Sequence, residues 1–146
     1  MFIDSHCHLD FPDLAKDLDV LLRNMQENQV THALCVSVDL PNFPRVLALA
    51  EKHQNLFASV GIHPDYEDQR EPSADELAGL ADHPKIIAIG ETGLDYYRLQ
   101  GDLEWQRERF RTHIRAARQT DLPLIIHTRS ASDDTIAILR EEGGFS

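Results

Sequence analysis

The stretch DLEWQRERFRTHIRAARQTDLPLIIHTR, residues 102–129, contains both kinds of element from which the chain is built. Asp102 is a residue type that favours helix starts, and apolar positions then recur at helical spacing. The predicted buried stripe consists of Leu103, the stem of Arg107, Phe110, Ile114 and Ala117, while the other arginines are expected to face outward. Pro123 ends the helical pattern, and the apolar residues 124–126 predict a strand. The stretch is therefore interpreted as a helix followed by a short strand.

The same alternation recurs along the rest of the chain. Apolar runs predict strands at residues 2–3, 33–38, 57–62, 86–89 and 124–126, and helical spacing predicts helices at 12–28, 43–53, 73–82 and 131–142, the last ended by Gly143 and Gly144. Strands that alternate with helices indicate a parallel sheet, because parallel neighbours need crossover connections. Two α/β architectures fit this pattern, a doubly wound open sheet and a (β/α)₈ barrel. Residues 1–146 are predicted to form one domain.

The composition is ordinary for a soluble globular protein, with 42% apolar and 27% charged residues. No apolar run approaches the roughly 18 residues of a membrane helix, and the N-terminus lacks the features of a signal peptide. We therefore expect a cytoplasmic protein with no membrane partner. Cys7 and Cys35 lie in apolar runs and form no CxxC pair, which favours free buried thiols over a disulfide.

The chain is strongly acidic, with 14 basic and 25 acidic residues and a net charge of -11. Such a charge argues against a protein that grips long duplex DNA through a basic patch. It does not exclude nucleic acid as a substrate, because bound divalent cations supply positive charge at the point where a phosphate sits.

Polar residues follow most of the predicted strands. They are His6 and His8 after the first run, His63 after the third, Glu91 and Asp95 after the fourth, and His127 and Arg129 after the fifth. In both candidate architectures the carboxyl ends of the strands meet on one rim. Side chains alternate along a strand, so His6 and His8 share a face. Imidazole and carboxylate groups are ligands for zinc, manganese and magnesium, and the sequence therefore predicts a metal site on this rim.

These residue types fit a metal-dependent hydrolase. Glu91 has two oxygens with which to bridge two ions, and two close ions convert bound water into hydroxide and stabilise the leaving oxygen of a phosphodiester. The chain contains no GxSxG elbow, no GxGxxG and no GKS or GKT phosphate loop. A serine nucleophile therefore has no support from the sequence.

Several other polar residues are interpreted as structural. His113 lies within the long helix as a packed or surface side chain, and His32, His53 and His83 are expected at helix-to-strand turns opposite the rim. The five arginines between residues 107 and 118 alternate with Glu104 and Glu108, which favours a solvated helix face over a DNA contact. Tyr96 and Tyr97 fit two interpretations equally, stacking on a base or covering the rim.

Five segments resemble the TatD family of metal-dependent deoxyribonucleases. They are FIDSHCHLD (2–10), SVGIHPDY (59–66), IIAIGETGLDYY (86–97), QRERFRTHIRAARQTDLPLIIHTRSA (106–131) and DDTIAILREEGG (133–144). The resemblance spans almost the whole chain, and GETGLDYY with IIHTR are its most specific parts. It implies a TIM barrel of the metallo-dependent hydrolases and two divalent metal ions, with Mg, Mn and Zn all open. It also implies hydrolysis of DNA phosphodiesters, in several members as 3′ exonucleases.

The resemblance also implies roles for individual residues. His6 and His8 would bind the first metal, Glu91 would bridge the pair, and His127 would bind the second metal. The implied catalytic residues are Glu91, His63 and Asp95, with His63 and Asp95 either facing the substrate or supporting the ligands. Arg129 is a candidate for phosphate contact. The implied partner is DNA, as single strands or strand ends.

The chain departs from the family in length. A family barrel has about 250 residues, whereas this chain carries about five of eight βα units and ends where the sixth strand would begin. The missing part would supply a further histidine and a metal-binding aspartate. Three explanations stay open: a fragment, a truncated reading frame, or a half-barrel completed by another chain. We expect open sheet edges, self-association through them, and weak activity of the isolated chain.

Two alternative functions stay open beside the nuclease. One is another amidohydrolase-type metal hydrolase that acts on a small ester or amide; many of these use a carbamylated lysine as the bridge after strand four, where this chain has Glu91 and no lysine nearby. The other is a truncated, non-catalytic remnant that binds one metal poorly and acts by association.

Overall fold

The computed structural model describes residues 1–143, and Gly144, expected to help end the last helix, lies outside the described residues. Its sheet contains β1 (Phe2–Cys7), β2 (Val30–Cys35), β3 (Leu56–Val60), β4 (Ile86–Asp95) and β5 (Leu124–Arg129). The strand order is β1-β2-β3-β4-β5, and every neighbouring pair is parallel. A strand order that follows the chain excludes the doubly wound alternative, in which the order reverses.

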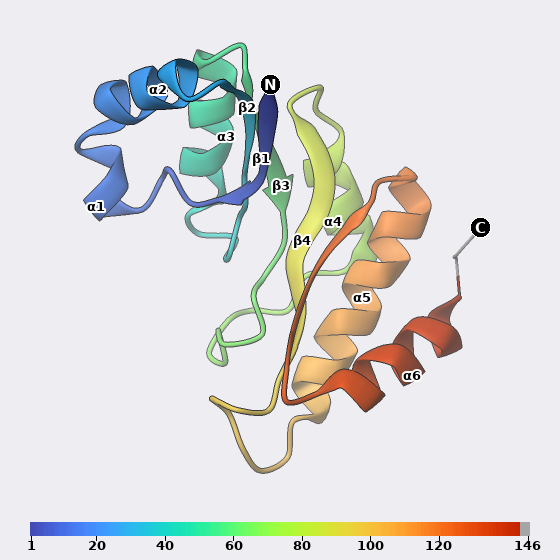
Figure 1. The fold of residues 1–146 in the computed structure, drawn as a ribbon. Helices are drawn as coiled ribbons and strands as arrows, with labels where there is room; N and C mark the ends of the chain where they lie inside the picture. Colours follow the sequence, from blue (N-terminus) through green and yellow to red (C-terminus); the bar gives the residue numbers. More distant parts are fainter. Residues whose placement is uncertain (144–146) are drawn as a thin grey trace.

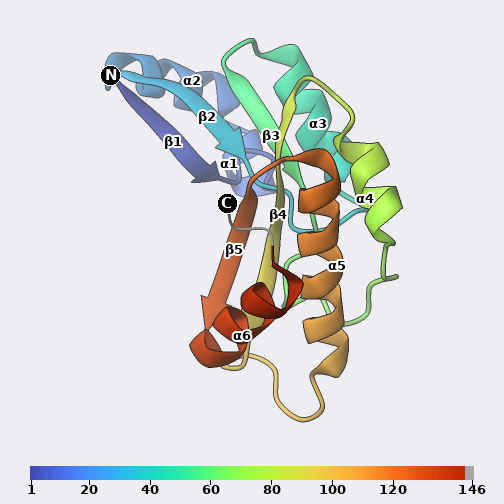
Figure 2. The same cartoon turned by 90° about the vertical axis from the view of Figure 1, so that its right-hand side faces the viewer.

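The helices are α1 (Pro12–Ala15), α2 (Leu18–Glu27), α3 (Phe43–Lys52), α4 (Ala74–Ala81), α5 (Glu104–Thr120) and α6 (Ser132–Glu142). Figures 1 and 2 show the sheet curled, with α2, α3, α4 and α5 along its outer side and β1 and β5 at its two ends. The described part is thus a curled half-barrel, as a partial TIM barrel requires. This confirms the predicted fold class.

The main difference from the sequence prediction lies near the N-terminus. One helix was expected over residues 12–28, but α1 ends at Ala15 and α2 begins at Leu18. Asp17 between them has φ −115° and ψ 23°, which is not helical, and its carbonyl accepts hydrogen bonds from the amides of Val20 and Leu21. The Asp17 side chain makes no capping hydrogen bond, so it is the non-helical backbone at this residue that divides the expected helix in two.

Three strands extend beyond the apolar runs that predicted them, whereas β2 and β3 end early, at Cys35 and Val60 instead of at residues 38 and 62. β1 continues to Cys7, β4 to Asp95 and β5 to Arg129. Polar residues at the ends of these strands face the rim instead of leaving the sheet, so apolar content alone underestimates the strand lengths. The second strand begins at Val30, three residues before the predicted start, and includes His32, which was expected in a turn.

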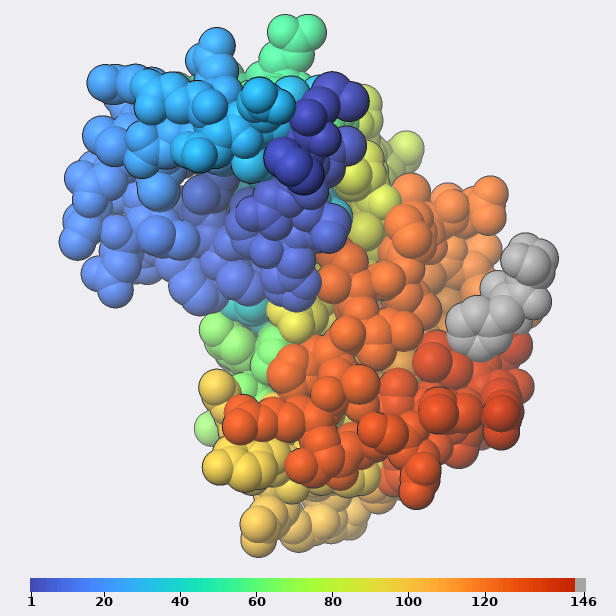
Figure 3. Space-filling view, in the orientation of Figure 1, coloured from blue at the N-terminus to red at the C-terminus, as the bar shows by residue number. Residues whose placement is uncertain are grey.

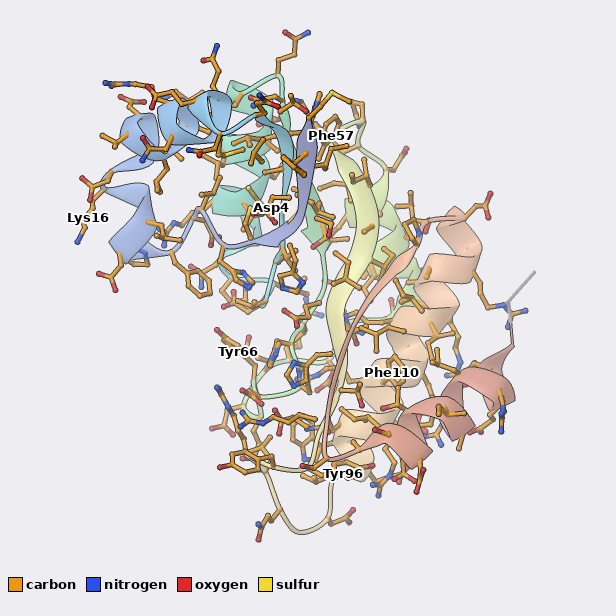
Figure 4. The ribbon with its side chains drawn as sticks, viewed as in Figure 1. Asp4, Lys16, Phe57, Tyr66, Tyr96 and Phe110 are labelled. Carbon is orange, nitrogen blue, oxygen red and sulfur yellow. The ribbon has the colours of Figure 1, made fainter. Side chains whose placement is uncertain are left out.

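Two clusters of buried side chains hold the helices to the sheet. The larger cluster lies between β2, β3 and β4 and helices α3 and α4, and includes Val46, Leu56, Leu77 and Ile89. The smaller cluster joins α5, α6 and the end of β4 through Leu94, Phe110, Ile114 and Ile138. Figure 4 shows Phe110 on α5 in this second region.

The predicted stripe of α5 is confirmed for its apolar members, but Arg109 departs from the prediction. Its side chain is 1% exposed and forms an ion pair with Glu71, whereas all arginines beyond Arg107 were expected to face outward. Arg115 does face outward, with a side chain 49% exposed, whereas the side chain of Arg111 is only 15% exposed and pairs with exposed glutamates, among them Glu108.

The edges of the sheet are open in the described part of the chain. β1 pairs only with β2 and β5 only with β4, and Phe2 and Ile3 on β1 are both more than 60% exposed. The expected self-association through these edges stays a prediction. Among the helices of residues 1–143, none has the length and apolar character needed to cross a bilayer.

Candidate metal centre

The first histidine pair is placed by the carboxyl end of β1. His6 lies within the strand, and His8 follows it. The Nδ1 of His8 lies 3.0 Å from the carbonyl oxygen of Val36, so Nδ1–H donates to that carbonyl and Nε2 is left with a free lone pair. The ring of Phe11 stacks on the other side of His8 at a centroid distance of 4.7 Å. Both contacts fix the ring in an orientation suited to a metal ligand.

Glu91 lies at an irregularity of β4. Gly90 pairs with Ile125 and Thr92 with Ile126, so the register shifts at Glu91, which has no partner on β5. Gly90 and Gly93 on either side have φ of +138° and +131°. A β-carbon at Gly93 would lie 2.0 Å from the carbonyl oxygen of His127. The two glycines of the GETG segment are therefore required by the backbone that carries Glu91.

The carboxylate of Glu91 contacts histidines on both sides. Its Oε2 lies 3.2 Å from Nε2 of His6, and its Oε1 lies 3.5 Å from Nδ1 of His127 and 3.8 Å from Nε2 of His63. Glu91 is 7% exposed, so its nearest polar neighbours are these imidazoles. One residue of β4 thus lies close to histidines of both edge strands, His6 of β1 and His127 of β5.

His127 forms a hydrogen bond with Asp95 through the ring nitrogen that faces away from Glu91. Its Nε2 lies 2.9 Å from Oδ2 of Asp95, which is fully buried. The other oxygen of Asp95 accepts hydrogen bonds from the amides of Tyr97 and Arg98. Burial raises the pKa of Asp95, but the backbone bond from Arg98 and the bond from His127 outweigh it, so the pKa lies below its ordinary value. The ionised carboxylate accepts from Nε2–H and leaves Nδ1 of His127 free to bind a metal.

His63 follows β3 and completes the cluster. Its Nε2 lies 3.2 Å from Nδ1 of His127. Burial lowers the pKa of His63 below its ordinary value; the Glu91 carboxylate opposes this and His127 adds to it. Tyr66, three residues later, has its ring centroid 6.3 Å from that of His63 and lies at the same rim (Figure 4).

The side chains form two groups whose donor atoms suit a metal ion. One consists of His6, His8 and Glu91 and the other of His63, Glu91 and His127, and in each the donor atoms lie within 4.8 Å of one another. Donors about 2.0 Å from a tetrahedral ion lie roughly 3.3 Å apart, and the separations that involve Glu91 range from 3.2 to 3.8 Å. The nitrogen and oxygen donors fit zinc or manganese, and both groups include Glu91.

The rim is accessible from outside. In the space-filling view, green and yellow segments that follow β3 and β4 reach the surface below the blue N-terminal segment (Figure 3). Arg129 at the end of β5 is exposed, and its guanidinium carbon lies 3.9 Å from the ring centroid of Tyr97. The hydroxyl of Tyr96 instead donates to Asp134 on α6. The two tyrosines that the sequence could not distinguish therefore have different surroundings.

The structure also shows buried polar residues that the sequence analysis did not assign to the site. Gln106, Arg109 and His113 all lie on the inner side of α5, and each contacts the backbone next to His63. The sequence contains one indication of this arrangement. The three residues are spaced by three and four positions, which places their polar side chains on the helix face that also carries Phe110. On β3, Ser59 accepts from the amide of Ser37 and donates to the carbonyl of Gly90, which links β3 with β4 and with the segment after β2, beside Glu91.

Comparisons with known proteins agree with this geometry. The family model described as "TatD related DNase" matches residues 3–146. The chain is 40% identical over 144 residues to YcfH of Escherichia coli K12, and this covers 96% of the chain and 54% of YcfH. It is 35% identical to YabD of Bacillus subtilis, with 98% of the chain and 56% of YabD covered. Both relatives are named as uncharacterized metal-dependent hydrolases. The chain spans about half the length of the curated relatives it matches.

Two solved structures have the same fold. One is YjjV, a TatD homologue from Escherichia coli K12, which superposes with a TM-score of 0.86 at 34% identity and covers 99% of this chain and 60% of YjjV. The other is a TatD family hydrolase from Entamoeba histolytica, with a TM-score of 0.85, 31% identity, and coverage of 97% of this chain and 54% of the other. The strand order, the histidine and carboxylate groups at the carboxyl ends and the match over residues 3–146 lead to one conclusion. The chain belongs to the TatD family.

Proposed function

We propose that this chain carries the metal centre of a metal-dependent hydrolase that cleaves DNA phosphodiester bonds. One observation carries the proposal: the two oxygens of Glu91 point to different histidines, with Oε2 3.2 Å from His6 and Oε1 3.5 Å from His127. A carboxylate placed in this way is suited to bridging two ions. Two-metal centres are a common solution for in-line displacement at a phosphodiester.

In this proposal each residue has a distinct role. His6, His8 and Glu91 hold one divalent ion, and Glu91, His127 and His63 surround the second. When bound, the ions supply an activated water and neutralise charge on the phosphate oxygens. Asp95 acts through His127, because it accepts the Nε2–H and keeps Nδ1 directed at the centre.

The substrate in this proposal is a DNA end or a single strand. The net charge of -11 argues against a long basic interface with duplex DNA, so contact with a phosphate falls to groups at the rim. Arg129 offers a guanidinium at the rim, stacked on Tyr97, which suits contact with one phosphate. The description of the family model as a related DNase favours DNA as the substrate. Removal of nucleotides from a 3′ end rests only on the resemblance to a family in which several members are 3′ exonucleases.

The test is digestion of a single-stranded oligonucleotide labelled at its 5′ end, with and without Mn²⁺ or Mg²⁺. We expect a metal-dependent ladder of shortened products with the wild-type chain and none with Glu91→Ala. His53→Ala is the matched control and should retain activity, because His53 ends α3 next to the start of β3, at the end of the strand opposite the rim. A terminal phosphorothioate at the 3′ end should block the ladder.

Other outcomes would change the proposal. Full-length oligonucleotide after incubation with folded, metal-loaded protein would contradict DNA cleavage by this chain. Metal-dependent hydrolysis of a small aryl ester under the same conditions, again abolished by Glu91→Ala, would favour the alternative metal hydrolase. Loss of both reactions would favour the non-catalytic remnant.

A further inference from the structure

Three consecutive residues of the loop after β3 are each held by a different side chain of α5. The amide of Ile62 donates to Nε2 of His113 at 3.0 Å, and the carbonyl of His63 accepts from Nη1 of Arg109 at 3.2 Å. The carbonyl of Pro64 accepts from Nε2 of Gln106 at 3.2 Å. The loop that carries His63 is thus fixed by side chains and not only by the strand that precedes it.

The same helix also holds the end of β4. The Oε1 of Gln106 accepts from the amide of Asp95 at 2.9 Å, while its Nε2 donates to Pro64. A single side-chain amide therefore connects the backbone of Asp95 with the loop that carries His63. Both groups then meet at His127, where Nε2 contacts Asp95 and Nδ1 lies 3.2 Å from His63.

These helix side chains are costly to bury, which indicates that their contacts matter. Gln106 and His113 are both 0% exposed, and Arg109 is 2% exposed. A buried polar group without partners destabilises the fold, whereas here each group has partners of good geometry. His113 donates from Nδ1 to the carbonyl of Arg109 at 2.8 Å, which leaves Nε2 as the acceptor for Ile62. Arg109 is neutralised by Glu71.

We infer that Gln106 is a positioning residue for the group formed by His63, Glu91 and His127. It fixes the separation between the backbone of Asp95 and that of the His63 loop, and thereby the orientation of both imidazoles. The group of His6, His8 and Glu91 receives no contact from Gln106, so the effect is selective. This inference rests on the proposed metal centre, because selectivity between the two groups is its measurable consequence.

The test is titration of the folded chain with Mn²⁺ by isothermal titration calorimetry. The two binding steps are assigned with His6→Ala and His127→Ala. Gln106→Met keeps a long side chain of similar volume but removes the acceptor and both donors. In Gln106→Met we expect the affinity for Mn²⁺ at the group of His127 to fall about tenfold or more, the size of effect that loss of a ligand-supporting contact produces. The affinity for Mn²⁺ at the group of His6 should stay within about twofold of wild type.

Phe110→Leu is the matched control, because Phe110 lies on the same helix, is 0% exposed and packs in the smaller cluster. It should lower the melting temperature without changing the ratio of the two affinities. A structural role for Gln106 alone would make Gln106→Met behave like Phe110→Leu, and that result would overturn the inference. If the wild-type chain binds no Mn²⁺, the proposed metal centre itself fails. If wild type binds Mn²⁺ and Gln106→Met leaves the ratio of the two affinities unchanged, only the inference fails, so the two failures are distinguishable.

A measurement on the wild-type chain keeps the inference testable if Gln106→Met does not fold. Coupling between metal binding and the Gln106 contacts is reciprocal, so metal should protect the contacts that the side chain makes. We expect exchange of the Asp95 amide hydrogen to slow at least about tenfold when Mg²⁺ or Zn²⁺ saturates the protein. Bound metal should stabilise the group of His63, Glu91 and His127, and local opening at the Asp95 amide then becomes rarer. Equal exchange rates with and without bound metal would overturn the inference.

Discussion

The Nε2 of His127 lies 2.9 Å from Oδ2 of Asp95, and this contact determines which nitrogen of His127 faces the candidate metal centre. Asp95 is fully buried and accepts two further hydrogen bonds from backbone amides, so its carboxylate has no freedom to turn away. Of the two roles expected for Asp95, facing the substrate or supporting a ligand, its contact with His127 favours the second.

Replacement of Asp95 should therefore act on the metal. In Asp95→Asn the side chain loses its charge, and its contact to Nε2–H weakens. We expect Mn²⁺ affinity at the group of His127 to fall about ten- to hundredfold, measured by calorimetric titration. Asp134→Asn is the control, since Asp134 lies on α6, contacts Tyr96 and belongs to neither group of ligands. Wild-type affinity in Asp95→Asn would contradict the assigned role.

The two glycines at positions 93 and 79 should respond in opposite ways to alanine. Gly93 has φ +131°, and a β-carbon there would lie 2.0 Å from the carbonyl oxygen of His127. Gly93→Ala should lower the free energy of unfolding by at least about 3 kcal/mol, because backbone atoms of two strands must separate. In Gly79→Ala the added methyl meets nothing within 4 Å on helix α4, so we expect a gain of about 0.5 to 1 kcal/mol. Urea unfolding measures both, and destabilisation by Gly79→Ala as large as that by Gly93→Ala would contradict the geometry.

Two arginine–glutamate pairs should contribute differently to stability, because one arginine is buried and the other is exposed. Glu71 pairs with Arg109, whose side chain is 1% exposed, whereas Glu76 pairs with Arg70, whose side chain is 69% exposed. Glu71→Gln leaves the buried guanidinium without its counter-charge, and we expect a loss of about 1 to 2 kcal/mol in the free energy of unfolding, reduced from that of a fully buried pair because Glu71 is half-exposed. Glu76→Gln should change stability little. Chemical unfolding of both variants at pH 7 tests this, and equal losses would contradict it.

His113 should make stability depend on pH. Burial lowers its pKa in the folded chain to about 4, from an ordinary value near 6.5. Between these two values the unfolded chain binds a proton that the folded chain does not, so the folded state loses stability as the pH falls from about 6.5 to about 4. The loss attributable to this residue is up to about 3 kcal/mol.

The variant His113→Gln isolates this contribution, because it removes the titrating group. The difference in unfolding free energy between wild type and His113→Gln should shrink as the pH is lowered through this range. Ile114→Val, which removes a buried methyl group from the next position, should instead differ from wild type by a constant amount. A pH-independent difference for His113→Gln would show that the ring is not held neutral.

The fold and much of the candidate site were predictable because both depend on local patterns. Apolar runs separated by helical spacing predicted the order of elements, and the carboxyl ends of parallel strands must meet on one rim. His6, His63, Glu91 and His127 were therefore predicted as neighbours before any distance was known, and the distances agree. The break at Asp17 was missed, since a single acidic residue within an amphipathic pattern fits equally well inside a helix.

The contacts that α5 makes with the residues of the site were not predictable from the sequence. They depend on which face of the helix meets the sheet and on how far along the strands the helix lies. Arg109 lies among several arginines of one helix, and only its approach to Glu71 and to the His63 carbonyl distinguishes it. Gln106 has no feature of its own in the sequence. Its importance comes from backbone groups of β4 and of the loop after β3, which lie 11 and 42 residues away along the chain.

The proposed metal centre is tested most sharply by the number of Mn²⁺ ions that the chain binds, measured by equilibrium dialysis on wild type, His6→Ala and Glu91→Ala. Because Glu91 belongs to both groups of ligands, we expect two ions for wild type, one for His6→Ala, and none with comparable affinity for Glu91→Ala. If Glu91→Ala retained one or two ions at wild-type affinity, Glu91 would not join the two groups into one metal centre.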